Sequence, residues 1–375
     1  MMQQALSTNV ETLEEQTFTE DDSFEVPPPD VIAYNELRSC ADLYRLAREG
    51  LLEIHSDFQR EIVWNKPAQT RFIDSLVKQL PIPSMCFSFD YKTERWQVID
   101  GLQRMSTIVR FLSGDKWTLS AVPDIDPSIA GTHVPDFLPT TPGDNLELHK
   151  YYRRIENFTL PITVIRCDSS NPKHMEYVFT IFHRLNTGST KLNNQEIRNC
   201  IYSGAFNDLL VELDQNEIWL KLNGRSSTDG DRYRGRELIL RLFAFQDCYQ
   251  HYKGRLAAFL NEYMQAWRQP DSEFLAAKKE LFDRTVRIVG LSIFKGRPHG
   301  NVRLSVLEAT LVGVACNLDW LQGQADNVIR QMYYDLLKAD EFSDEILSEG
   351  LSGIPRVQGR MSTAKRIFSG RRDDK

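Results

Sequence analysis

Residues 95–112, "RWQVIDGLQRMSTIVRFL", combine a β-rich run, one sharp turn and an amphipathic helix. The helix is indicated by apolar residues at positions i, i+3, i+4 and i+7, namely Met105, Ile108, Val109 and Leu112. The turn before it carries four residues of a different kind, Asp100, Gly101, Gln103 and Arg104. A strand that passes directly into a helix through such a turn predicts a functional loop in an α+β domain.

The turn has the composition of an anion site. A helix N-terminus presents unpaired N–H groups and a partial positive charge, and Gly101 allows a ligand to approach the backbone closely. Arg104 can clamp a phosphate with two donors, and Gln103 can bond a phosphate oxygen or hold an attacking water. Asp100 can coordinate a metal or orient that water. The structural alternative, a turn in which Asp100 and Arg104 simply pair with each other, stays open.

Local signals around this stretch predict helices and a hairpin. Ser39 is placed to cap a short helix that Gly50 stops, and Pro67 suits the first turn of the next one. Residues 85–100 read as two strands around a polar turn, and residues 113–150 as a long irregular insertion.

A second set of signals follows the insertion. Residues 158–167 read as another strand, and a helix then ends at "NTG", residues 186–188. Asn193 and Glu196 form a capping box for the next helix. Beyond residue 200 the helical period dominates, which predicts an all-helical region.

Composition bounds the class of protein. The 375 residues are 41% hydrophobic and 26% charged, which is the balance of a globular protein with a core. The start lacks a basic region followed by an apolar stretch, and no apolar run is long enough to cross a membrane. The six scattered cysteines contain no CxxC pair and suggest reduced thiols. We therefore expect a cytoplasmic protein with no membrane partner.

The net charge of −7 is unevenly distributed. Residues 1–30 hold eight acidic and no basic residues and predict a flexible tail, whereas residues 351–375 read as a basic tail. Between them we expect an α+β domain at 31–200 and a helical domain at 201–350. The overall acidity argues against a protein that coats nucleic acid but leaves room for a local basic site.

Three further stretches carry candidate side chains. "FQREIVW" at 58–64 holds Gln59 and Arg60, and Arg60 suits either a structural ion pair or a second phosphate ligand. "FHRLNTGSTKL" at 182–192 places Arg184 and Asn186 at a helix end, where ordinary helix-stop chemistry is at least as good an explanation. "NGRSSTDGDRYRGRELILR" at 223–241 fits a solvated loop or a nucleic-acid contact.

Taken together, the motifs resemble one family. In chain order they are "FQREIVW", "FIDSLVKQLPIP", "IDGLQRMSTI" and "FHRLNTGSTKLNNQEIRN", spanning residues 58 to 199. This series is similar to the N-terminal domain of GmrSD-type modification-dependent restriction enzymes, whose fold resembles ParB and sulfiredoxin. The resemblance implies a pocket in which an Asp-Gly-Gln-Gln-Arg loop contacts phosphates and supports nucleoside triphosphate hydrolysis, in bacterial defence against phage DNA.

Carried over by position, the resemblance implies a set of site residues and a substrate. The catalytic set is Asp100, Gln103 and Arg104. The phosphate-binding set is Gln59, Arg60, Gly101, Arg104, Thr107, Arg184 and Asn186. The substrate it implies is a nucleoside triphosphate with a divalent metal, Mg²⁺ being the first choice.

Two departures from the family pattern bear on activity. The first Gln of the loop is Leu102 here, which removes one amide that would bind phosphate or position water. The C-terminal half contains only His251 and His299, too few histidines for a His-Asn-His nuclease. The leading expectation is a metal-dependent nucleoside triphosphate hydrolase. The alternatives are a non-catalytic nucleotide or DNA sensor that regulates a partner nuclease or toxin, and an enzyme that nicks DNA itself.

Overall fold

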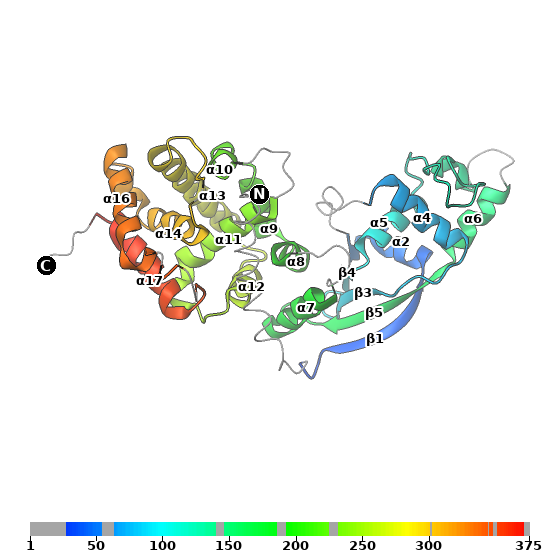
Figure 1. The fold of residues 1–375 in the computed structure, drawn as a ribbon. Helices are drawn as coiled ribbons and strands as arrows, with labels where there is room; N and C mark the ends of the chain where they lie inside the picture. The colour runs from blue at the N-terminus through cyan, green and yellow to red at the C-terminus, as the bar shows by residue number, and fades with distance from the viewer. Residues whose placement is uncertain are drawn as a thin grey trace. The chain divides into compact units, whose positions relative to one another are not determined.

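The computed structural model describes residues 28–54, 64–139, 146–185, 193–224, 232–300, 302–343, 345–347 and 351–370. Contacts divide the chain into two compact units whose boundary falls between residues 191 and 192 (Figure 1). We call residues 26–191 the N-terminal unit and residues 192–375 the helical unit. The predicted tail at residues 1–30 lies outside the described residues up to residue 27.

The N-terminal unit is built on a mixed five-stranded sheet. Its strands, in spatial order, are β1 (Ile32–Ser39), β5 (Thr159–Cys167), β3 (Met85–Asp90), β4 (Arg95–Asp100) and β2 (Leu52–Glu53). β1 pairs antiparallel with β5, and β3 pairs parallel with β5 and antiparallel with β4. β2 runs parallel to β4. The expected hairpin of β3 and β4 is confirmed, and the last residue of β4 lies opposite Cys86 near the start of β3.

Helices cover both faces of this sheet. They are α2 (Cys40–Arg48), α4 (Lys66–Val77), α5 (Leu102–Leu112), α6 (Leu146–Glu156) and α7 (Pro172–Leu185). Alternate strand residues such as Ile162 and Val164 join one core cluster with α2, α4 and α5. Ile165 is buried as well but points to the opposite face, and α7 packs against β4 and β5. Figure 1 shows α2, α4 and α5 together, with α7 beside the strands.

The locally coded helix starts are confirmed. Ser39 Oγ accepts from the backbone N–H of Asp42 at the start of α2, and Pro67 lies in the first turn of α4. The reciprocal capping box of Asn193 and Glu196 opens the first helix of the helical unit.

The insertion at 113–150 is less irregular than expected. Residues 118 and 133 form a β-bridge, a short 3₁₀ helix follows at Val134–Phe137, and α6 begins at Leu146. Trp117 and Ile129 are buried in the main core. The Pro, Gly and Asp content broke the regular periodicity, but the apolar residues between them still pack as part of the domain.

The helical unit contains helices throughout its described residues, as expected. They are α8 (Asn194–Ile201), α9 (Ala205–Leu213), α10 (Glu217–Leu222), α11 (Arg232–Cys248), α12 (Leu256–Ala266), α13 (Ser272–Arg287), a π-helix η3 (Ile288–Ile293), α14 (Leu304–Ala315), α15 (Leu318–Leu321), α16 (Asp326–Lys338) and α17 (Ile354–Phe368), with short 3₁₀ turns at Tyr249–His251 and Asp340–Phe342. α14 is buried over most of its length and packs against α11, α13 and α17.

One expectation for this unit needs correction. Residues 354–368, within the expected basic tail, form α17, which buries Met361, Ala364 and Phe368. Ala364 and Phe368 crowd Gly313 of α14 so closely that a Cβ there would lie 2.7 Å from the Phe368 ring. The basic residues of this segment suggested a tail, but its apolar residues recur at helical spacing. The segment is a packed helix rather than a tail.

All six cysteines lie in the described residues and are free thiols. None of the helices in the described ranges combines the length and the apolar character needed to cross a bilayer.

Candidate functional site

The turn between β4 and α5 is built on a glycine that no other residue replaces easily. Gly101 is the N-cap of α5 and has φ +95° and ψ 17°, a left-handed conformation that L side chains rarely adopt. A Cβ at this position would lie 2.5 Å from Cγ of Met85, a core residue that is 1% exposed. Gly101 is therefore required for both conformation and space.

The glycine leaves the start of α5 without a capping side chain. The first backbone bond of the helix runs from the N–H of Met105 to the carbonyl of Gly101. The N–H groups of Leu102, Gln103 and Arg104 precede it and have no carbonyl one turn back within the helix. Because these amides carry the positive end of the helix dipole, the turn has the backbone geometry of an anion site.

Asp100 and Arg104 form an ion pair, as the structural alternative predicts. Their closest atoms, Oδ2 and Nη2, are 3.0 Å apart. Arg104 also donates to the backbone carbonyls of Pro83 and Ser84. Burial lowers the pKa of the Arg104 guanidinium, and the charge of Asp100 opposes that shift. Arg104 thus ties the chain at residues 83–84 to the first turn of α5.

Gln103 links a second segment of the chain, which ends at Trp64, to the same turn by a hydrogen bond. Its Oε1 accepts from the backbone N–H of Trp64 at 2.9 Å, and Nε2 of Gln69 donates to the Trp64 carbonyl at 2.8 Å. Trp64 is the last residue of "FQREIVW", so this motif ends at the first turn of α5. Thr107 is buried one turn further on, and its hydroxyl donates to the Gln103 carbonyl at 2.7 Å.

The remaining candidates lie elsewhere or outside the described residues. Gln59, Arg60 and Asn186 fall in the ranges that are not described. Arg184 is exposed near the end of α7. Residues 168–171 connect β5 to α7, which packs back on β5 and therefore returns along it. Since β4 runs opposite to β5, the last turn of α7 is directed toward the end of the sheet where β4 ends.

Two neighbours define the electrostatics and the apolar wall of the turn. Burial and the charge of Asp100 raise the pKa of the Cys86 thiol to about 12, so this cysteine stays protonated. Leu102, at the position of the missing glutamine, packs against the core cluster.

The protein itself offers one carboxylate for a metal ion at the turn. Across the described ranges there is no group of three or more His, Cys, Asp or Glu side chains arranged to hold a metal ion. Asp100 offers one partly exposed carboxylate. Because Mg²⁺ is commonly held by one or two carboxylates together with substrate phosphates, Asp100 suits an ion that arrives with a nucleotide.

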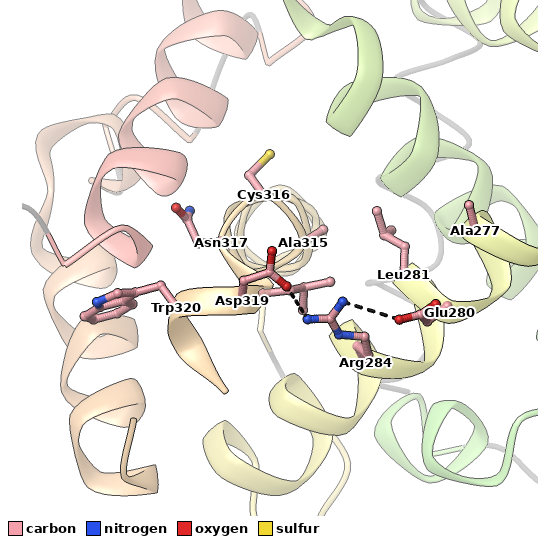
Figure 2. A pocket seen from close by; sticks show the side chains of 10 residues that line it. Ala277, Glu280, Leu281, Arg284, Ala315, Cys316, Asn317, Asp319 and Trp320 are labelled. Atoms are coloured by element: carbon pink, nitrogen blue, oxygen red, sulfur yellow. Dashed lines mark hydrogen bonds and ion pairs between the residues drawn. The ribbon is translucent and has the colours of Figure 1, made fainter. Parts of the chain in front are cut away.

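A hollow of about 490 Å³ lies in the helical unit between α13, the end of α14 and α15 (Figure 2). Arg284 at its wall bonds Asp319 at 2.5 Å and Glu280 at 3.5 Å, so its charge is already matched by two carboxylates. Burial raises the pKa of the Cys316 thiol, which makes it a poor nucleophile. The lining residues are Ala277, Glu280, Leu281, Arg284, Ala315, Cys316, Asn317, Leu318, Asp319 and Trp320. At this hollow, as at the β4–α5 turn, the arginine is paired with carboxylate groups.

Sequence reasoning missed the role of residues 83–85. "PIP" at 81–83 reads only as the end of a helix, yet the carbonyls of Pro83 and Ser84 hold Arg104 and Met85 limits the space at Gly101. The co-occurrence of this segment with "IDGLQR" in one motif series was the available signal.

Comparison with families gives one result. Residues 41–203 match the family model described as the GmrSD restriction endonuclease, N-terminal domain. This range contains β3, β4, α5 and α7, and so includes the whole turn described above. Comparisons with curated proteins and with solved structures gave no match. Residues 41–203 of this chain are therefore similar to the N-terminal domain of the GmrSD restriction endonuclease.

Proposed function

We propose that this chain binds a nucleoside triphosphate with Mg²⁺ at the β4–α5 turn and hydrolyses it, as a cytoplasmic component of a bacterial restriction or anti-phage system. We further propose that its N-terminal unit has a ParB/sulfiredoxin-like fold. The observation that carries the proposal is the Gly101-capped start of α5, with Asp100 on one side and Arg104 on the other. Free amides, a cation and a carboxylate within one turn are the parts that phosphoryl transfer needs.

The ion pair suggests how the site would change when substrate binds. A phosphate at the amides of residues 102–104 would attract the Arg104 guanidinium and release Asp100. The free carboxylate would then hold the Mg²⁺ that neutralises the phosphate oxygens. In this scheme Arg104 stabilises developing negative charge and Asp100 positions the metal or the attacking water.

Gln103 and the flanking motifs would complete the site. Gln103 would orient water or a phosphate oxygen after its bond with the Trp64 amide is broken. Gln59 and Arg60 belong to the segment that ends at Trp64, and Arg184 and Asn186 to the segment that leaves α7. We propose that these four residues and Thr107 line the same pocket.

A sensor without hydrolysis is the second candidate, and specific observations favour it. In the described structure Gln103 and Arg104 are both held by internal hydrogen bonds, and Leu102 is packed into the core. A nucleotide that binds at this turn without being hydrolysed would then act as a signal to a partner nuclease or toxin. DNA nicking with Asp100 as the metal ligand is a third candidate.

Phosphate release and nucleotide binding, measured separately, distinguish the first two functions. We would compare the wild type with Arg104→Ala, Asp100→Asn and Leu102→Gln for each nucleoside triphosphate with Mg²⁺. Arg110→Ala is the matched control, because Arg110 lies on the same helix and also donates to another part of the domain, Oε1 of Gln69 at 2.9 Å.

The proposal expects release that is lost in Arg104→Ala and Asp100→Asn, raised in Leu102→Gln and kept in Arg110→Ala. Binding without release, lost in Arg104→Ala, would establish the sensor instead. If the wild type neither binds nucleotide nor releases phosphate, the phosphate site is refuted. Nicking of supercoiled plasmid with Mg²⁺, abolished by Asp100→Ala, would establish the third function, and nicking that survives this substitution would indicate a contaminant.

A further inference from the structure

The segment after the π-helix η3 forms a tight, basic turn in the helical unit. Its described residues, 294–300, read "FKGRPHG" and contain no acidic side chain. Lys295 and Gly296 both have left-handed backbones, with φ of +55° and +70°. The N–H of Gly296 bonds the carbonyl of Gly290 at 2.8 Å, and the N–H of Arg297 bonds that of Phe294 at 3.1 Å. These bonds hold the backbone of the turn, on which the exposed Lys295 and Arg297 lie.

The turn is also fastened to the end of α10. The N–H of His299 donates to the Leu222 carbonyl at 2.8 Å, and Pro298 lies against Gly224. Lys221 is the neighbour of Leu222 in the last turn of α10 and is exposed. The backbone bond therefore joins the end of α10, which carries the exposed Lys221, to the turn that carries Lys295 and Arg297.

Arg234, near the start of α11, belongs to the same cluster. Burial and the charge of Arg234 together lower the pKa of His299 to about 4, which places Arg234 close to this turn. Lys295 and Arg297 are exposed and Arg234 is half-buried. Within the described part of the chain, none of these four cations forms an ion pair with a carboxylate. We call Lys221, Arg234, Lys295 and Arg297 the basic surface.

We propose that the basic surface binds the phosphate backbone of duplex DNA. Four cations that pair with no carboxylate of the described residues, on a hydrogen-bonded turn and two helix ends, suit phosphate contacts that fix position without reading bases. Single-stranded nucleic acid is bound by aromatic side chains that stack on bases, and the one aromatic ring of the turn, Phe294, packs on Tyr333 instead, with centroids 5.4 Å apart. The choice of DNA over RNA rests on the proposed restriction function, while the surface itself is separate from the β4–α5 turn.

Fluorescence anisotropy with a short labelled DNA duplex tests this proposal on the full chain. The test variant is Lys295→Glu with Arg297→Glu. The control, Lys253→Glu with Lys338→Glu, makes the same change of net charge at two other exposed lysines. Each phosphate contact contributes about 0.9 to the slope of log affinity against log salt. The test variant should bind at least about tenfold more weakly at low salt, with a slope smaller by roughly two, and the control should bind like the wild type.

Further measurements separate failure of this proposal from failure of the nucleotide site. Nucleotide binding by the test variant should equal that of the wild type, and its thermal melt should be unchanged. The milder pair Lys295→Gln with Arg297→Gln should show an intermediate loss of DNA affinity. Absence of DNA binding by the wild type, or equal loss in test and control variants, would overturn the proposal whether or not nucleotide binds. Equal or tighter binding of duplex RNA would overturn the assignment to DNA.

Discussion

Replacing Gly101 by alanine should destabilise the N-terminal unit by two additive effects. An alanine at φ +95° adopts a left-handed conformation at a cost of about 1–2 kcal/mol relative to glycine. Its Cβ would also lie 2.5 Å from Cγ and 2.8 Å from Sδ of Met85, and overpacking of a core costs about 1–3 kcal/mol. Because Met85 is buried and flexible it will shift partly, so we expect a total loss of roughly 2–5 kcal/mol in the free energy of unfolding.

Native-state hydrogen exchange of the β3 and β4 amides, measured along a urea titration, reports the stability of this unit alone. Gly50→Ala is the control, because Gly50 has φ +70° and nothing within 4 Å of its added Cβ. The Gly50→Ala variant should therefore lose only the conformational part of the free energy of unfolding. In a Met85→Ala background the further loss caused by Gly101→Ala should fall toward the Gly50→Ala value, since Cγ and Sδ are gone and only Cβ, at 3.0 Å, remains. Equal losses in Gly50→Ala and Gly101→Ala would refute the steric argument.

Three other predictions concern contacts away from the glycine. Gln103→Met should cost about 1–2 kcal/mol in the same urea assay, because it leaves the Trp64 N–H without its acceptor, whereas Gln103→Glu keeps an acceptor and should cost less. Burial alone would raise the pKa of Asp168, but hydrogen bonds from Lys92 and Ser170 lower it from 3.8 to about 2. The stability that these bonds give is present above pH 4 and lost between about pH 4 and pH 2, so the wild type and Asp168→Asn should differ at pH 7 and converge near pH 2 in urea titrations. Asn193→Ala should cost about 1 kcal/mol in a thermal melt by removing the capping box of α8, and Asn193→Ser should recover most of it.

The sequence predicts best where a short-range signal decides the structure. Ser39, Pro67 and the Asn193 capping box act within one helical turn, and the hairpin of β3 and β4 needs only a short polar turn. β1 was not predicted, because its first residues are largely exposed and its partner, β5, lies more than a hundred residues away. Pairing at that distance leaves no periodic trace in either strand.

The candidate site shows the same division. A glycine between a strand and a helix predicts a tight turn, and the possible pair of Asp100 and Arg104 follows from their i, i+4 spacing. The acceptors at Pro83 and Ser84 are backbone carbonyls, which every residue type carries. No residue-type pattern could therefore assign Arg104 to them. The bond from the Trp64 amide to Gln103 was hidden for the same reason.

Arg104 donates to the carbonyls of Pro83 and Ser84, so these carbonyls compete with the proposed phosphate ligand for its guanidinium. A phosphate that draws the guanidinium away deprives two carbonyls of their donor, so part of the binding free energy is used to loosen that segment. Linkage is reciprocal, and a substitution that loosens residues 81–84 beforehand should tighten nucleotide binding by the same amount. Faster hydrogen exchange at Ser84 and Met85 on adding nucleotide would report this competition, and unchanged exchange would show that Arg104 stays where it is.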